Sequence, residues 1–158
     1  MDFINKLCKA VEGCEWRGNY SGEGEIFTEL KQCLQQFCGS LDLGVPCNIY
    51  FENLDNGKIK PILAFGAECW PDGVVEIPGI LNAAIEVKLR TRTTMPAADV
   101  LGQCMMYRAG YDWAIGVIVD EGPRPAAKQF RGDEDALKAR LWEANQIRVI
   151  TVQPKVRQ

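Results

Sequence analysis

Residues 71–89 read PDGVVEIPGILNAAIEVKL, and this stretch decides the fold. Within it, residues 73–77 form a short apolar run, and Pro78-Gly79 directly after them is a turn signal. The second run, 81–89, is almost continuously apolar, which is typical of a strand buried on both faces of a sheet. The pattern predicts a β-hairpin with Asp72 at the head of its first strand.

The second predicted strand carries Glu86, Val87 and Lys88 in direct succession. Residues two apart in a strand face the same side, so Glu86 and Lys88 point together while Val87 points into the core. A hairpin of this length can bring Asp72 across from Glu86. Two adjacent carboxylates repel each other unless a cation or Lys88 neutralises them. The hairpin therefore predicts a cation site.

Carboxylate oxygens are the ligands that hard cations such as Mg²⁺ prefer. A bound cation can activate water, and a lysine beside it can stabilise charge that develops on a phosphate. We therefore expect hydrolysis of phosphodiester bonds that depends on Mg²⁺ or Mn²⁺. The alternative is a simple salt bridge between Glu86 and Lys88, because a short acid-x-Lys sequence occurs by chance in many proteins.

The residue inventory narrows the possible chemistry. The absence of histidine excludes serine triads, Cys–His pairs and histidine-ligated zinc sites. The odd number of cysteines and the lack of any CxxC pair predict reduced, mostly buried thiols, and no iron–sulfur cluster is expected. The cysteines are Cys8, Cys14, Cys33, Cys38, Cys47, Cys69 and Cys104.

Net charge and hydropathy limit the kinds of partner that the chain can have. The net charge is −3, with an acidic segment 1–57 and a slightly basic segment 58–158. Phosphate binding needs a local positive patch more than a positive total, so a nucleic-acid partner is compatible with this balance. We find neither an apolar run long enough to cross a bilayer nor a signal-peptide pattern, so we predict a cytoplasmic protein without a membrane partner.

The whole chain, 1–158, is expected to form a single domain, because it contains no repeat, low-complexity tract or long linker. Residues 1–22 are predicted to be a short helix and a loop, and the polar tail 153–158 is predicted to fray. Apolar periodicity predicts the remaining elements: helices at 23–39, about 96–109 and 133–144, and strands at 47–51, 61–65, 73–77, 81–89, 113–119 and 147–152.

Because of Asp72, the Glu86-Val87-Lys88 triplet and the order of the predicted elements, the segment 23–120 resembles the PD-(D/E)xK nuclease superfamily. The resemblance implies an α/β, restriction-endonuclease-like fold: a mixed central sheet flanked by helices, with core order α-β-β-β-α-β and an added C-terminal helix and strand. It also implies that Asp72, Glu86 and the Val87 carbonyl hold one or two divalent metals, and that Lys88 orients the attacking water.

Gln103 and Tyr107 lie four residues apart and so share one face of the predicted helix after this strand. Their spacing resembles the QxxxY motif of RecB-type nucleases, a branch of the same superfamily, which implies that both border the active site. The alternative is an exposed Gln103 and a core Tyr107. The chain departs from that branch in being short and in lacking its four-cysteine set.

The superfamily often takes one further acid from its leading helix. Glu25 and Glu29 lie one turn apart on one face of the predicted helix 23–39. We favour Glu29 as the additional catalytic acid, because it lies deeper in the helix and flanks the apolar stripe. The alternative is an ordinary solvated glutamate.

Basic residues follow the predicted metal site. Lys88, Arg90 and Arg92 would continue along one side of the strand at a period of two, and Lys58 and Lys60 could add to them. Such a row suits a phosphate backbone, although an ordinary solvated edge has the same pattern.

These features together predict a deoxyribonuclease, with endonuclease action favoured over exonuclease action. The DNA substrate could be single-stranded, duplex or branched, and the small size suggests a homodimer or a larger complex. Two alternatives stay open: a nuclease of the same fold that acts on RNA, and a catalytically silent module that binds nucleic acid or has a structural role.

Overall fold

The computed structural model describes residues 2–42, 44–123 and 132–155. Five strands form the central sheet in the spatial order β1-β4-β5-β6-β7. Their bounds are β1 Asn48–Phe51, β4 Gly73–Ile77, β5 Leu81–Arg90, β6 Trp113–Asp120 and β7 Ile147–Val152. The four helices of the described segments are α1 Asp2–Glu12, α2 Glu23–Gly39, α3 Ala97–Tyr107 and α4 Glu134–Asn145.

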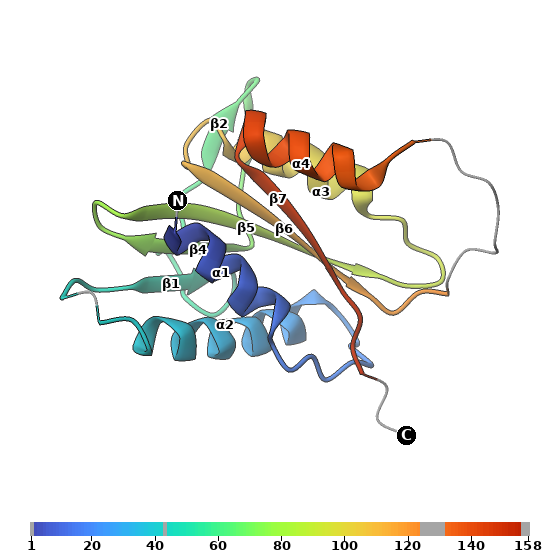
Figure 1. The fold of residues 1–158 in the computed structure, drawn as a ribbon, viewed down its shortest axis with the longest axis horizontal. Coiled ribbons are helices and arrows are strands. Elements are labelled where there is room, and N and C mark those ends of the chain that lie inside the picture. The colour runs from blue at the N-terminus through green and yellow to red at the C-terminus, as the bar shows by residue number, and fades with distance from the viewer. Residues whose placement is uncertain (1, 43, 124–131, 156–158) are drawn as a thin grey trace.

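The sheet is mixed. β4 pairs antiparallel with both β1 and β5, whereas β5, β6 and β7 run parallel to one another. Parallel neighbours need a crossover, and α3 and α4 supply the two crossovers from β5 to β6 and from β6 to β7. Helices α1 and α2 cover one face of the sheet, while α3 lies on the other face and α4 lies near β7 (Figure 1). The predicted mixed α/β class with a flanked central sheet is confirmed.

Alternation along β5 divides the core into two clusters. Ala83, Ile85 and Val87 are fully buried against α1 and α2. Ala84 faces α3 instead, and Glu86 and Lys88 follow it on that face at a period of two. The apolar stripe of α2 fills the first cluster, and each fully buried Leu or Ile contributes about 1.5–3 kcal/mol.

Gly116 allows α3 to approach the sheet closely. It lies in β6 directly opposite Glu86 of β5. A Cβ atom there would be 2.3 Å from Val100 Cγ1 and 3.3 Å from Cys104 Sγ, both on α3. The missing side chain therefore determines how near α3 lies to the strand that carries Glu86.

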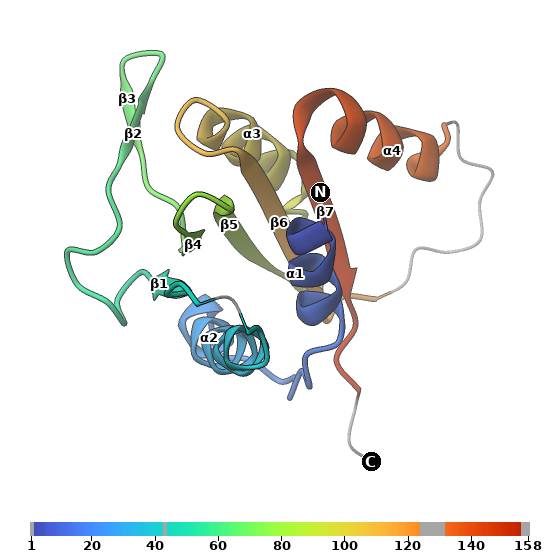
Figure 2. The same cartoon turned by 60° about the vertical axis from the view of Figure 1, so that its left-hand side comes forward.

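The predicted strand at 61–65 exists as β2, Ile62–Ala64, but it does not join the central sheet. It pairs with β3, Ala67–Cys69, in a separate two-stranded sheet that stands beside α3 (Figure 2). The sequence did not predict β3, because three residues are too few to show an alternation. Within the central sheet, the order α2-β1-β4-β5-α3-β6 reproduces the expected α-β-β-β-α-β order.

One prediction falls partly outside the described residues. The tail was predicted to fray from residue 153, and 156–158 lie outside the described residues, while 153–155 have no regular secondary structure. Among the described helices, none is both long and apolar enough to span a membrane.

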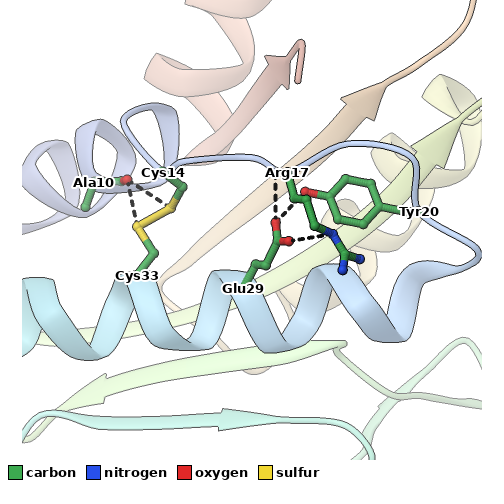
Figure 3. Close-up of a disulfide and its surroundings, with 6 residues drawn as sticks. All are labelled: Ala10, Cys14, Arg17, Tyr20, Glu29 and Cys33. Atoms are coloured by element: carbon green, nitrogen blue, oxygen red, sulfur yellow. Dashed lines mark hydrogen bonds and ion pairs between the residues drawn. A yellow bond between two sulfur atoms is a disulfide. The ribbon is translucent and has the colours of Figure 1, made fainter. Parts of the chain in front are cut away.

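The prediction that all cysteines are reduced is wrong. Disulfides join Cys14 to Cys33 and Cys38 to Cys47, with Cα–Cα distances of 5.9 Å and 5.8 Å. The first links the chain just after α1 to the middle of α2, as Figure 3 shows. Spacing along the sequence could not predict this, because the packing of α1 on α2 brings the first pair together. Cys8, Cys69 and Cys104 remain free.

Candidate metal centre

Asp72 and Glu86 lie side by side on the α3 face of the sheet. The β4–β5 register pairs Gly73 with Ile85, so one step further along this antiparallel ladder Asp72 faces Glu86. Both residues are almost fully buried, with exposed fractions of 7% for Asp72 and 1% for Glu86. The hairpin therefore brings together the two carboxylates that the sequence singled out.

Pro71 ends the ladder between β4 and β5 at this point. The same register pairs Pro71 with Val87, and proline has no N–H to donate to the Val87 carbonyl. The Val87 N–H donates instead to Asp72 Oδ2 at 2.7 Å. Since the N–H and C=O of one strand residue point toward the same neighbour, the Val87 carbonyl faces the side where Asp72 lies.

Lys88 lies among three carboxylates. Its Nζ atom is 2.8 Å from Glu86 Oε1, 3.5 Å from Glu23 Oε2 and 4.0 Å from Asp72 Oδ2. Glu23 is the first residue of α2, so the site draws on a helix as well as on the hairpin. Three carboxylates around one ammonium group leave negative charge in excess when all of them are ionised. The site therefore favours a further cation.

Tyr107 and Gln103 of α3 complete the buried side of the site. The Tyr107 hydroxyl is 2.6 Å from Glu86 Oε2, 2.9 Å from Gln103 Oε1 and 2.9 Å from the Trp70 carbonyl. One hydroxyl proton cannot serve three acceptors, but a turned Gln103 amide can donate to the hydroxyl oxygen instead. Tyr107 is thus a core residue, and it also contacts both Gln103 and Glu86 through its hydroxyl group.

Burial raises the pKa of the Asp72 carboxyl to about 7, and the neighbouring charge of Glu86 acts in the same direction. The Val87 N–H and Lys88 oppose this shift without cancelling it. Without a bound cation, Asp72 therefore holds a proton up to neutral pH. A metal ion would compete with that proton, because metal-binding carboxylates must be deprotonated.

Burial by itself would lower the pKa of Lys88, but its contacts with Glu86, Asp72 and Glu23 outweigh burial and raise that pKa. Lys88 therefore stays protonated at neutral pH in the metal-free protein. A lysine in this state can hold a water molecule or an anionic oxygen, but it cannot accept a proton.

The residues present fit a hard divalent cation. Glu86 Oε1 is buried, and its ion-pair partner is Lys88, whose Nζ atom is 2.8 Å away. Asp72 uses Oδ2 for the Val87 N–H, and the described part of the chain supplies no hydrogen bond to Oδ1. No group of three Cys, Asp or Glu side chains in the described segments is arranged to hold a metal. The donor set is therefore two carboxylates and the Val87 carbonyl, all of them oxygen ligands.

No protein-family model, curated protein or solved structure matches this chain. What the site can do follows from its own chemistry: buried carboxylate oxygens, an ammonium group beside them and a tyrosine that contacts one carboxylate.

Glu29, the favoured additional acid, has other partners. It accepts hydrogen bonds from the Tyr20 hydroxyl and the Arg17 N–H, and it pairs with the Arg17 side chain (Figure 3). Glu25 also pairs with Arg17. The α2 acid that contacts Lys88 is Glu23. Depth within the helix was a misleading guide, because the start of α2, not its middle, lies beside the hairpin.

The predicted basic row is interrupted after Lys88. Arg90 is paired with Asp120 at 2.5 Å and donates to the Pro123 carbonyl, so its charge is neutralised within the fold. The strand ends at Arg90, and Arg92 lies in the exposed bend that follows. The expectation that Arg92 continues one side of the strand is therefore wrong, because the period of two ends with the strand.

Lys58 and Lys60 lie on the link between β1 and β2, where both are exposed. They line a groove of about 460 Å³ together with Tyr50, Tyr111 and Glu76. Glu76 lies four residues beyond Asp72 on the same face of β4, a separation of about 13 Å at 3.3 Å per residue. The two lysines are thus separate from Lys88 but on the same face of the sheet.

Proposed function

We propose that the chain is a nuclease that hydrolyses phosphodiester bonds of DNA and uses Mg²⁺ or Mn²⁺ as its cofactor. The observation that carries the proposal is the buried Asp72–Glu86 pair, whose two carboxylates lie beside a single ammonium group, that of Lys88. Burying two carboxylates together is unfavourable unless a cation compensates. An isolated Glu86–Lys88 salt bridge would not need Asp72 beside it.

A divalent cation at this position would lower the pKa of a bound water and polarise the phosphate. Asp72, Glu86 and the Val87 carbonyl would hold it. Lys88 keeps its positive charge and stabilises the negative charge that develops on the phosphate. Tyr107 holds Glu86 in its orientation through Oε2, so that Oε1 faces Lys88 and the cation would share this oxygen with the lysine. Gln103 lies one contact further out, where it can orient a water or a phosphate oxygen.

We further propose that the chain belongs to the PD-(D/E)xK superfamily and has the restriction-endonuclease-like fold. The α-β-β-β-α-β order around Asp72 and Glu86 supports this. The contact of Gln103 with Tyr107, and of Tyr107 with Glu86, supports the RecB-type branch.

The experiment is a cleavage assay on labelled linear and closed-circular DNA, single- and double-stranded, with Mg²⁺, Mn²⁺ or EDTA. We expect metal-dependent cleavage by the wild-type chain, and cutting of closed circles would identify endonuclease action. Asp72→Asn, Glu86→Gln and Lys88→Met should each lower the cleavage rate by about 100-fold or more. The matched control is Glu143→Gln, which changes an exposed acid on α4 away from the site.

Wild-type rates in all three site variants would end the proposal. Cleavage of RNA but not DNA under the same conditions would keep the metal chemistry and replace the substrate. Mn²⁺ binding by calorimetry without cleavage of either polymer would indicate a module that kept the site but not the reaction.

A further inference from the structure

The β2–β3 hairpin, together with its flanking residues 61–70, forms an arm that projects from the molecule (Figure 2). One side of the arm is anchored, since Ile62 and Ala64 are buried in the cluster under α3. The other side is open: Leu63 is 74% exposed and Phe65 at the tip is 98% exposed. The arm is therefore held along one side and offers an aromatic ring at its tip.

The backbone at the tip is unusual for the residue that occupies it. Phe65 and Gly66 form a two-residue turn between the paired residues Ala64 and Ala67, with φ of 50° and 79°. Such turns need positive φ at both central positions, which Asn, Asp and Gly adopt most readily. A bulky aromatic residue at positive φ is strained, and strain of this kind marks candidate functional positions. Stability alone does not account for a phenylalanine here.

The root of the arm is joined directly to the candidate metal centre. Trp70, its last residue, places its carbonyl 2.9 Å from the Tyr107 hydroxyl, which is also 2.6 Å from Glu86. Asp72 follows only two residues later. Trp70 is itself 49% exposed. A molecule lying on the metal centre therefore meets the root of the arm.

The link that leads into the arm adds positive charge. Lys58 and Lys60 line the groove described above, whose walls also contain Tyr50 and Tyr111. Among the described residues that line it, Glu76 is the one acid. A groove that combines basic and aromatic side chains suits single-stranded nucleic acid, because lysines follow the backbone while rings stack on the bases.

Resting on the proposed function, we propose that the arm is a stacking platform on which Phe65 receives an unpaired base of the substrate, while the backbone passes Lys58 and Lys60 toward Asp72. The bases of an intact duplex are covered by their neighbours, so an exposed ring stacks only where a strand is unpaired or opened. The preferred substrate is therefore a single strand or a duplex with an unpaired stretch.

The test is a binding measurement in EDTA, so that no hydrolysis occurs and the result does not depend on catalysis. Single-stranded DNA carrying 2-aminopurine and a blunt duplex of the same sequence are titrated with wild-type protein, Phe65→Ala and Phe65→Trp. Leu137→Ala is the matched control, because it truncates an exposed apolar side chain on α4. Sedimentation of each variant without DNA reports self-association.

We expect Phe65→Ala to weaken single-strand binding by about 5- to 100-fold, in line with the loss of one stacked base. It should also abolish the change in 2-aminopurine fluorescence, and Phe65→Trp should restore both. Binding of the blunt duplex, and all binding by Leu137→Ala, should change by less than about twofold, as expected where no stacked base is lost.

Equal single-strand affinity in wild-type protein and Phe65→Ala overturns the proposal. A wild-type dimer that becomes monomeric in Phe65→Ala, with DNA binding unchanged, assigns the tip to a second copy of the chain and also overturns it. Phe65-dependent binding by a chain that cleaves nothing with Mn²⁺ supports the platform and removes the nuclease proposal, so the two can fail separately.

Discussion

The Val87 N–H donates a hydrogen bond of 2.7 Å to Asp72 Oδ2, and this contact joins two neighbouring strands at the candidate metal centre. It takes the place of the ladder interaction that ends at Pro71. Asp72 Oδ2 thus stabilises the contact between the two strands, and Asp72 Oδ1 is left for a ligand. The same residue pair therefore links the stability of the hairpin to the chemistry that we propose.

Asp72→Asn separates these two roles, because an amide oxygen can still accept the Val87 N–H bond while the buried charge is lost. We expect the free energy of unfolding in EDTA at pH 8 to rise, on the order of 1–3 kcal/mol, since Asp72 no longer has to ionise beside Glu86. Adding Mn²⁺ should raise the melting temperature of the wild-type chain but not of the variant. Equal Mn²⁺ responses would show that Asp72 is not a ligand.

The stability of the metal-free protein should fall as pH rises from about 4 to about 7. Burial and Glu86 raise the pKa of Asp72 from its ordinary 3.8 to about 7, so the folded state binds more protons than the unfolded state between these values. Stability decreases wherever the folded state binds more protons and pH increases. Urea unfolding in EDTA measures this, with Asp72→Asn as the reference for all other titrating groups. An identical pH dependence in both proteins would contradict the shift.

Tyr107→Phe removes the donor that meets Glu86 Oε2 while keeping the ring in the core. The buried carboxylate loses a hydrogen-bond partner, which should cost about 1–3 kcal/mol of the free energy of unfolding. Cleavage should also slow, because Glu86 is no longer held in one orientation. Denaturant unfolding and cleavage rates report the two effects, and unchanged values of both would show that the contact is incidental.

Gly116→Ala should destabilise the protein by about 1–3 kcal/mol through overpacking, since the new Cβ atom would lie 2.3 Å from Val100 Cγ1. The combination with Val100→Ala removes the clashing atom. The double variant should therefore lose less stability than the two single variants added together. Strictly additive losses would mean that α3 can shift away from β6 without cost.

Replacing Cys14 and Cys33 by serine should lower the free energy of unfolding by about 3 kcal/mol, as expected for a disulfide that closes a loop of this length. Unfolding with and without a reductant measures the effect, and reductant should no longer act through this pair in the variant. The same stability in wild-type protein and variant under oxidising conditions would show that the bridge contributes nothing.

Local patterns predicted much of the fold. The apolar stripe predicted α2 at the residues where it lies, and the Pro-Gly turn predicted the hairpin of β4 and β5. The spacing of Gln103 and Tyr107 predicted that they share a helix face, and they are in contact. These features depend on residues that are close in sequence, so periodicity and turn chemistry are sufficient to reveal them.

The predictions that the structure does not support concern contacts between segments that are distant in the sequence. Glu29 and Glu23 lie on the same helix, and only the packing of α2 on the sheet brings Glu23, not Glu29, to Lys88. The period of two along the strand predicts that Arg90 is available for phosphate, but its charge is paired with Asp120 on the next strand. The Cys14–Cys33 disulfide depends in the same way on the packing of two helices.

The sequence by itself determined the β4–β5 hairpin, the alternation that turns Glu86 and Lys88 to one side, and the helix face that Gln103 shares with Tyr107. The tertiary structure alone decided which α2 acid reaches Lys88, that β2 and β3 leave the central sheet as an arm, and which cysteines pair. The physical reason is that hydrogen-bond register and side-chain period act over a few residues. Contacts between elements depend instead on how whole faces pack, as at Gly116, where a missing side chain allows α3 to approach β6.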